Sequence, residues 1–221
     1  METNTVIFDM DGLLIDSEPL WNEAANRVFA RYNIHLTPQQ YESTTGLRTK
    51  EFVHWWFAHY GQSAADIDRA RQSIVEEVIT LVEQKGVSMP GVHYIFDFFH
   101  TRGFRIGMAT SSPKELIDVV LNMLDIRNYL GAVSSADQLA YGKPHPQVYL
   151  DCATVLGASP MQCICFEDSY NGLIAAKAAR MKCVVVPSPE KISDPRWNAA
   201  DLKISSLADF TDDLLKATGR F

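Results

Sequence analysis

The chain has 221 residues, of which 47% are hydrophobic, so it can bury a sizeable core in one large domain or in a domain with a small insert. Its net charge of −7 and its pI near 5.3 disfavour nucleic-acid binding, because proteins that bind phosphate backbones need a concentrated basic face. We find no basic and apolar leader and no uncharged run of about 18 residues, so we expect a cytoplasmic protein without membrane contact.

The first predicted element is a buried strand at Thr5–Phe8, a run of β-branched and aromatic residues. Two carboxylates, Asp9 and Asp11, follow in the loop that leaves this strand. Because two such acids raise each other's pKa and burial raises it further, a pair of this kind usually holds a cation, transfers protons, or does both. Asp9 at the strand end suits a nucleophile, and Asp11 in the turn suits a general acid and base.

The following stretch predicts helices and no strand. Ser17 is the expected N-cap of a helix with Pro19 in its first turn, and its apolar positions have helical spacing as far as Tyr32. Further helices are expected at three places: after Thr37, over Thr49–Tyr60 and over Asp66–Lys85.

After Met89 the pattern changes to alternating strands and helices. Strands are predicted at 104–110, 132–134, 163–166, 183–186 and 202–204, and helices end at Gly103, begin after Ser112, and cover 146–156 and 171–180. Ser112 and Glu115 are assigned to capping of the helix that follows them. The cysteines lie inside these apolar patterns and are expected to be buried free thiols: Cys152, Cys163, Cys165 and Cys183.

The strand and helix alternation implies an α/β fold, with a Rossmann-like, doubly wound parallel sheet. We expect residues 1–16 and 87–221 to form this core domain, and residues 17–86 to form a small all-helical cap domain inserted after the first strand. Ligands bind beyond the carboxyl ends of the strands in such sheets. The cap would therefore cover the edge where several polar residues meet: Asp9, Asp11, Thr110, Ser111, Glu167 and Asp168.

Four motifs occur in order along the chain: Asp9-Met-Asp-Gly12, Thr110-Ser111, Gly142-Lys-Pro144 and Glu167-Asp-Ser169. In this order they closely resemble the motifs of the haloacid dehalogenase-like (HAD) superfamily, over essentially the whole chain. The helical insert resembles the C1 cap of the β-phosphoglucomutase-like branch. Within that branch the phrases at 8–21, 45–48 and 143–149 look most like bacterial phosphatases that hydrolyse 2-deoxyglucose-6-phosphate and hexitol phosphates.

The resemblance implies a hydrolase of carbohydrate metabolism, a Mg²⁺-dependent phosphatase acting on small sugar or sugar-alcohol phosphates. Asp9 would take the phosphoryl group as an aspartyl-phosphate, and Asp11 would protonate the leaving oxygen and then activate water. The Thr110 hydroxyl, the Ser111 backbone N–H and the Lys143 ammonium group would bind the phosphoryl oxygens.

The resemblance also implies a magnesium site, and oxygen ligands of this kind suit that ion. Mg²⁺ would be held by the Asp9 carboxylate, the backbone carbonyl of Asp11 and the Asp168 carboxylate. Glu167 would bind the ion directly or through a water molecule.

Several residues of the insert are candidates for substrate contact. Arg48 follows a loop that contacts substrate in the family, and we weigh this role against that of a surface arginine. Lys50 is a weaker candidate for the same role. Trp21, Trp55 and Trp56 have helical spacing and are expected in the core of the cap rather than as a platform for sugar.

Two other functions stay open. Sugar phosphomutases of the same branch usually have histidine in place of Trp21 and arginine in place of Thr49, and both differences favour a hydrolase. A non-catalytic module that binds a phosphorylated sugar would be expected to have lost Asp9, Asp11 or Lys143, and all three are present. We expect a monomer that binds a small phosphorylated sugar or polyol and no nucleic acid.

Overall fold

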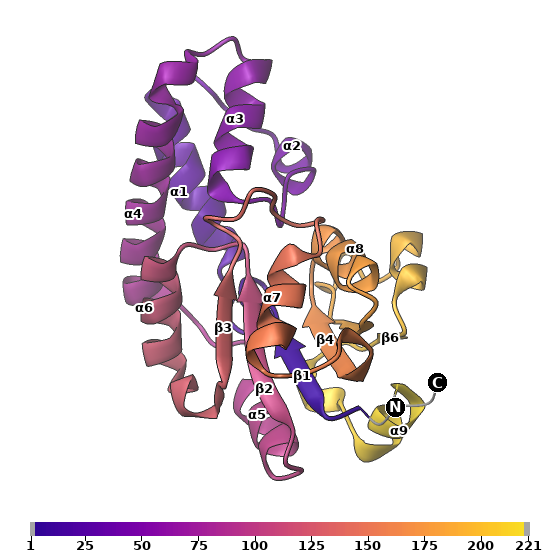
Figure 1. Cartoon of the computed structure of the whole chain (residues 1–221). Coiled ribbons are helices and arrows are strands. Elements are labelled where there is room, and N and C mark those ends of the chain that lie inside the picture. Colours follow the sequence, from indigo (N-terminus) through magenta and orange to yellow (C-terminus); the bar gives the residue numbers. More distant parts are fainter. Residues whose placement is uncertain (1–2, 219–221) are drawn as a thin grey trace.

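The computed structural model describes residues 3–218, and within them six parallel strands form one sheet in the order β3-β2-β1-β4-β5-β6 (Figure 1). The strands are β1 (Thr5–Phe8), β2 (Arg105–Thr110), β3 (Ala132–Ser135), β4 (Cys163–Glu167), β5 (Lys182–Val185) and β6 (Leu202–Lys203). The predicted doubly wound parallel sheet is therefore confirmed.

The helices are α1 (Glu18–Ala30), α2 (Pro38–Glu42), α3 (Thr49–His59), α4 (Ile67–Lys85), α5 (Val92–His100), α6 (Lys114–Leu124), α7 (Gln147–Val155), α8 (Tyr170–Ala178) and α9 (Asp212–Thr218). Figure 1 shows α1 to α4 together beyond the carboxyl ends of the strands, joined to the sheet through the segments that follow β1 and precede α5. These four helices cover the edge of the sheet where Asp9 follows the end of β1.

The sheet is buried on both faces, which explains the almost continuous apolar character of its strands. On one face the ring of Phe8 stacks on Phe96 of α5 and on Phe166 of β4, with ring centroids 4.9 and 5.1 Å apart. Ile7, the preceding residue, packs on the opposite face with the side chains of α7 and α8. Asp9 follows directly after this packed strand, so its backbone has little freedom to move.

The predicted elements begin and end within about two residues of the observed bounds, except that α5 ends at His100, three residues before Gly103. The start of α6, at Lys114, is one residue later than predicted. The predicted capping motif there is wrong, because the N-cap residue of α6 is Pro113 and no side chain caps the helix. Ser17 does occupy the N-cap position of α1, but its side chain makes no capping hydrogen bond. Both serine hydroxyls are used elsewhere, at the candidate site.

The four cysteine side chains are buried free thiols, as predicted. Burial raises the pKa of Cys152 to about 12 and that of Cys163 to about 11, which leaves both thiols protonated and unreactive at neutral pH. None of the helices within residues 3–218 has both the length and the apolar composition needed to cross a membrane.

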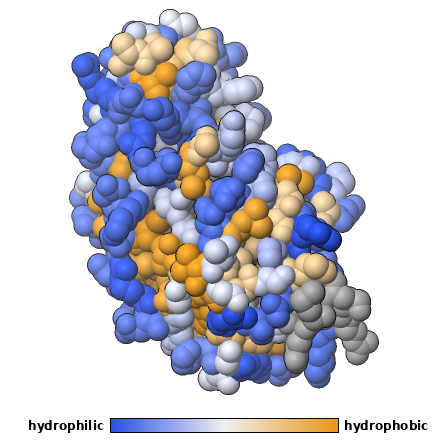
Figure 2. Space-filling model, viewed as in Figure 1, coloured by the Kyte–Doolittle hydropathy of each residue, from blue (hydrophilic) through white to orange (hydrophobic). Residues whose placement is uncertain are grey.

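The visible face of the molecule is mostly hydrophilic over the helices beyond the sheet edge (Figure 2). Hydrophobic side chains gather lower on this face, over the region that α6, β3 and α7 occupy in Figure 1. Exposed apolar residues of these elements are Met123, Val133 and Val155. This apolar surface lies to the side of the edge strand, away from the carboxyl ends of the strands.

Candidate active site

Asp9 lies at the start of a tight loop after β1, and backbone hydrogen bonds fix the conformation of this loop. Its backbone N–H donates to the carbonyl of Phe166 at 3.0 Å, and the loop closes where the Gly12 N–H donates to the carbonyl of Ile15 at 2.9 Å. Gly12 has a φ of 74°, and a Cβ on it would lie 2.1 Å from Asp168 Oδ2. Only glycine allows both this backbone conformation and the close approach of Asp168.

Lys143 lies between two carboxylates that come from different strands. Its Nζ is 2.6 Å from Asp9 Oδ1 and 2.6 Å from Glu167 Oε1, and it also donates to the carbonyl of Ala109 at 3.1 Å. The Tyr149 hydroxyl donates to the same Glu167 oxygen. Lys143 is 2% exposed, so this ammonium group is fixed in a buried position beside Asp9.

The carboxylates of the site carry more negative charge than Lys143 can neutralise. Burial, together with the charges of Glu167 and Asp11, raises the pKa of Asp9 to about 8 against the opposing effect of Lys143. Burial and the charges of Asp9 and Glu167 raise the pKa of Asp168 well above its ordinary value. Although burial lowers the pKa of Lys143, the charges of Asp9 and Glu167 raise it overall.

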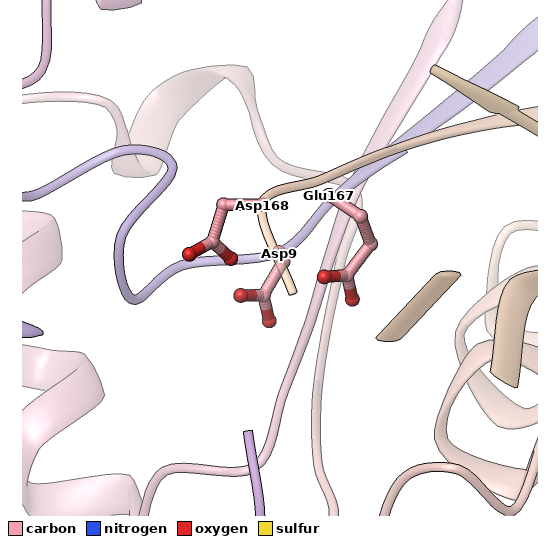
Figure 3. Close-up of side chains that lie close together, drawn as sticks. All are labelled: Asp9, Glu167 and Asp168. Atoms are coloured by element: carbon pink, nitrogen blue, oxygen red, sulfur yellow. The ribbon is translucent and has the colours of Figure 1, made fainter. Parts of the chain in front are cut away.

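Three of these carboxylates form a cluster that has the geometry of a cation site. Oxygen atoms of Asp9, Glu167 and Asp168 lie within 4.8 Å of one another, and Figure 3 shows Asp9 between the other two. Asp168 Oδ1 is buried and has no hydrogen-bond partner in the part of the chain that the structure describes. Hard oxygen donors with surplus negative charge and an unpartnered buried oxygen fit a divalent cation such as Mg²⁺.

The Asp11 carboxylate accepts hydrogen bonds on both of its oxygens. Oδ1 accepts from the Ser17 hydroxyl at 2.7 Å and from the indole N–H of Trp21 at 2.8 Å. Oδ2 accepts from the Ser112 hydroxyl at 2.6 Å and from the Thr110 hydroxyl at 3.4 Å. Donors from the turn after β2 and from the region of α1 therefore fix Asp11 next to Asp9.

Three of these donors were assigned other roles from the sequence. Ser112 was expected to cap a helix, and that assignment is wrong because its hydroxyl binds Asp11. Ser17 was expected to cap α1 with its side chain, and its hydroxyl also binds Asp11. The ring of Trp21 packs partly against the core, but its N–H reaches Asp11. A buried indole N–H needs a hydrogen-bond acceptor, and this requirement was the one feature of the sequence that could have indicated a polar partner for Trp21.

The other two tryptophans of the insert differ from each other. Trp56 is buried, and its N–H donates to the Thr44 hydroxyl at 3.2 Å, as suits a core residue. Trp55 is 59% exposed, so its predicted place in the core is wrong. Of the three predicted core tryptophans, only Trp56 is fully enclosed.

Lys50, the weaker candidate for substrate contact, is paired with Asp68 on the surface at 3.1 Å.

Thr110 and Ser111 lie where β2 ends beside β1. The Thr110 hydroxyl accepts from the Ser112 N–H at 3.1 Å, and the Ser111 hydroxyl donates to the carbonyl of Gly46 at 3.1 Å. Within residues 3–218 the backbone N–H of Ser111 has no protein acceptor. This N–H remains available to an anion that binds between Asp9 and the turn after β2.

A cavity separates this edge of the sheet from the helices above it. The sheet edge contributes the side chains already described, and the wall formed by the helices and their connections includes Glu18, Trp21, Tyr41, Thr44, Thr45, Thr49, Phe52 and Ile74. The Glu18 side chain has no hydrogen bond or ion pair among the described residues, and burial, with the charges of Asp11 and Asp16, raises its pKa to about 7. The sheet side of the cavity is therefore strongly acidic, and the side formed by the helices carries mostly hydroxyl and aromatic side chains.

Arg48, the expected substrate contact, does not line this cavity. Its guanidinium group donates to the carbonyls of Ala136, Leu139 and Ala140 and pairs with Glu51 at 2.6 Å. The side chain is 12% exposed. In this conformation Arg48 joins the helices to the segment before Lys143 instead of facing a substrate.

Further polar contacts hold the helices against the sheet edge. Arg71 of α4 donates to both carboxylate oxygens of Asp137 at 2.8 Å, and the Asp137 side chain is 8% exposed. The Asn171 amide at the start of α8 donates to the carbonyl of Thr45 at 2.9 Å. The structure thus has the helices closed over the candidate site.

A family model described as haloacid dehalogenase-like hydrolase matches residues 6–186. The chain is 44% identical over 211 residues to hexitol phosphatase B of Escherichia coli strain K12, covering 95% of both proteins. It is 32% identical over 184 residues to fructose-1-phosphate phosphatase YqaB of the same strain, covering 82% of this chain and 95% of that protein. The crystal structure of β-phosphoglucomutase from Clostridium difficile matches with a TM-score of 0.87 at 22% identity, covering 98% of this chain and 96% of that one, and this likeness concerns the fold.

Proposed function

The chain belongs to the haloacid dehalogenase-like hydrolase family, and we propose that it is a Mg²⁺-dependent phosphatase of small sugar or sugar-alcohol phosphates. The observation that carries this proposal is the buried Asp9, which lies beside Lys143 and close to a second aspartate, Asp11. The Asp11 carboxylate accepts hydrogen bonds from both sides of the cavity. Two relatives with names of sugar or hexitol phosphatases support the choice of substrate class.

Asp9 is the proposed nucleophile. One of its carboxylate oxygens attacks phosphorus, the bond from phosphorus to the ester oxygen breaks, and the phosphoryl group passes to Asp9 as an aspartyl-phosphate. Lys143, 2.6 Å from Asp9, offsets the negative charge of the transferred group. The Thr110 hydroxyl and the free N–H of Ser111 bind the phosphoryl oxygens.

Asp11 is the proposed general acid and base. In the first step it gives a proton to the leaving sugar oxygen, and in the second it takes a proton from the water that attacks the aspartyl-phosphate. Its four donors come from both sides of the cavity, since Trp21 belongs to α1 and Ser112 follows β2. Movement of α1 would therefore change the position of the acid.

The acidic cluster is the proposed magnesium site. The carboxylates of Asp9 and Asp168 and the backbone carbonyl of Asp11 are the proposed ligands. Glu167 is proposed to act beside the ion, through Lys143 or a bound water, because both of its oxygens already accept hydrogen bonds from protein donors. When bound, Mg²⁺ supplies positive charge that neutralises the phosphoryl oxygens.

We also propose the division of the chain into a core, residues 1–16 and 87–221, and a cap, residues 17–86. The cap would open to admit the substrate and close to exclude water, a motion expected on the microsecond-to-millisecond scale. The cytoplasmic location and the monomeric state expected from the sequence stay predictions.

Phosphate release from a panel of sugar and hexitol phosphates tests the proposal, with Mg²⁺ and with EDTA. Release that depends on Mg²⁺ and falls at least about a thousandfold in Asp9→Asn, with unchanged circular dichroism, is expected because the variant lacks the nucleophile. Undiminished release by Asp9→Asn would contradict the role of Asp9.

The same panel separates the two other candidate functions. Conversion of a sugar 1-phosphate to its 6-phosphate isomer without release of phosphate would indicate a phosphomutase. Binding of a sugar phosphate without release or isomerisation would indicate a non-catalytic module.

A further inference from the structure

The cap side of the cavity carries one charged side chain among the residues that the structure describes, and that charge is negative. It belongs to Glu18, the first residue of α1, and the rest of this wall is apolar, aromatic or hydroxyl-bearing. Arg48 could have supplied a positive charge, but its guanidinium group is bound to three carbonyls of the core and to Glu51. A leaving group that enters the cavity therefore meets no cation on the cap.

No described protein group forms an ion pair with the Glu18 carboxylate. Within residues 3–218 its side chain has neither an ion pair nor a hydrogen bond, and the charge of nearby Asp11 adds to its own. The cation that affects it most is Lys191, which does not line the cavity; it lies in an outer groove that Glu18 also borders, and it pairs with Glu42 at 3.5 Å. The Glu18 carboxylate is thus an acceptor with no donor of its own, on the wall of the cavity.

We infer that Glu18 is a specificity-determining residue that selects phosphate esters with an uncharged, hydroxyl-bearing leaving group; this rests on the proposed phosphatase function. Hydroxyl groups of a polyol or sugar donate hydrogen bonds to this carboxylate. A carboxylate or a second phosphate on the leaving group meets a like charge, and no described residue on the cap side of the cavity supplies a cation to offset it, which lowers its affinity. Glu18 therefore acts by rejecting anionic esters as well as by binding neutral ones.

This role also bears on the alternative of a phosphomutase. A mutase that works through a sugar bisphosphate must hold a second phosphate on the cap side while the first is at Asp9. The cap wall in this structure offers that second phosphate Glu18 and no cation among the described residues. The same side chain thus favours hydrolysis of monophosphates.

The experiment compares matched pairs of substrates that have the same carbon chain and differ only in the functional group at one carbon atom. Glucitol 6-phosphate and 6-phosphogluconate differ in whether C1 is an alcohol or a carboxylate, and glycerol 3-phosphate and 3-phosphoglycerate form a shorter pair with the same difference. Assays at pH 8, above the Glu18 pKa of about 7, keep its carboxylate charged. The wild-type protein is expected to favour the neutral member of a pair by at least about tenfold in kcat/KM.

Glu18→Gln removes the charge and keeps the size of the side chain. In this variant the ratio of kcat/KM for the neutral ester to kcat/KM for the anionic ester is expected to fall at least about fivefold. The fall comes from a rise in kcat/KM for the anionic ester relative to the neutral one. Asp16→Asn is the matched control, because Asp16 lies two residues away and lines the outer groove but not the cavity. Its selectivity ratio is expected to equal that of the wild type.

Equal hydrolysis of both members of each pair by the wild type would overturn the inference even if Glu18→Gln did not fold. A ratio that Glu18→Gln leaves unchanged, or that Asp16→Asn changes equally, would also overturn it. Failure of the proposed function has a different signature, because then none of these esters, nor p-nitrophenyl phosphate, releases phosphate with Mg²⁺.

Discussion

The two sides of the cavity differ in how their charged groups are held. On the sheet side, Lys143 is tied to Asp9 and Glu167 in a buried network that comes from three separate segments. On the cap side, Glu18 has no partner among the described residues, and the cap is joined to the core by polar contacts such as that of Arg71 with Asp137. The difference suggests that the sheet edge performs the chemistry, whereas the cap selects the substrate and controls access to it.

Lys143→Met tests the sheet side and should have the largest effect. It leaves two buried carboxylates, Asp9 and Glu167, without their cation, so we expect a loss of about 3 kcal/mol in the free energy of unfolding. Phosphate release should fall by at least about a hundredfold, since the positive charge beside the nucleophile is gone.

Urea denaturation with and without Mg²⁺ measures the effect on stability. Because the ion would replace part of the missing charge, Mg²⁺ should stabilise Lys143→Met more than it stabilises the wild type. Lys182→Met, at a half-buried lysine of β5 outside the site, is the control for losing a lysine. A Lys143→Met protein as stable and as active as the wild type would show that the network is not needed on the sheet side.

Trp21→Phe tests the link between the two sides, with an intermediate effect. It removes the indole N–H that holds Asp11 at 2.8 Å and keeps an aromatic ring. We expect kcat to fall about tenfold on sugar phosphates and much less on p-nitrophenyl phosphate, whose leaving group needs little help from an acid.

The comparison of the two substrates distinguishes loss of acid positioning from general damage. Trp56→Phe is the matched control, because it removes another indole N–H of the cap, whose acceptor is the Thr44 hydroxyl. Equal losses on both substrates, or an equal pattern in Trp56→Phe, would argue against a link between Trp21 and the general acid.

Arg71→Ala tests the attachment of the cap and should have the smallest effect. The variant loses two hydrogen bonds to Asp137, so the closed state is favoured less and we expect KM to rise about threefold with little change in stability. Arg69→Ala is the control, since Arg69 is exposed and its ion pair, with Asp66, lies within the cap. Initial-rate kinetics on one sugar phosphate would reveal a KM equal to that of the wild type if this contact does not hold the cap closed.

Much of the fold was predictable because its signals are local. A run of β-branched and aromatic residues predicted β1, and the alternation of strands and helices predicted the parallel sheet and the edge to which Asp9 points. The order of the motifs indicated the family before the contacts of any side chain were known. Each of these inferences depends on neighbouring residues or on their order along the chain.

The tertiary structure decided where several polar side chains find their partners. Ser112 has the local pattern of a helix cap but binds Asp11, which lies 101 residues earlier. Arg48 has the expected place near substrate but is held by carbonyls about 90 residues away, such as that of Leu139. A hydroxyl or guanidinium group takes whichever acceptor the fold brings near, and for residues so far apart that choice depends on the packing of the whole chain.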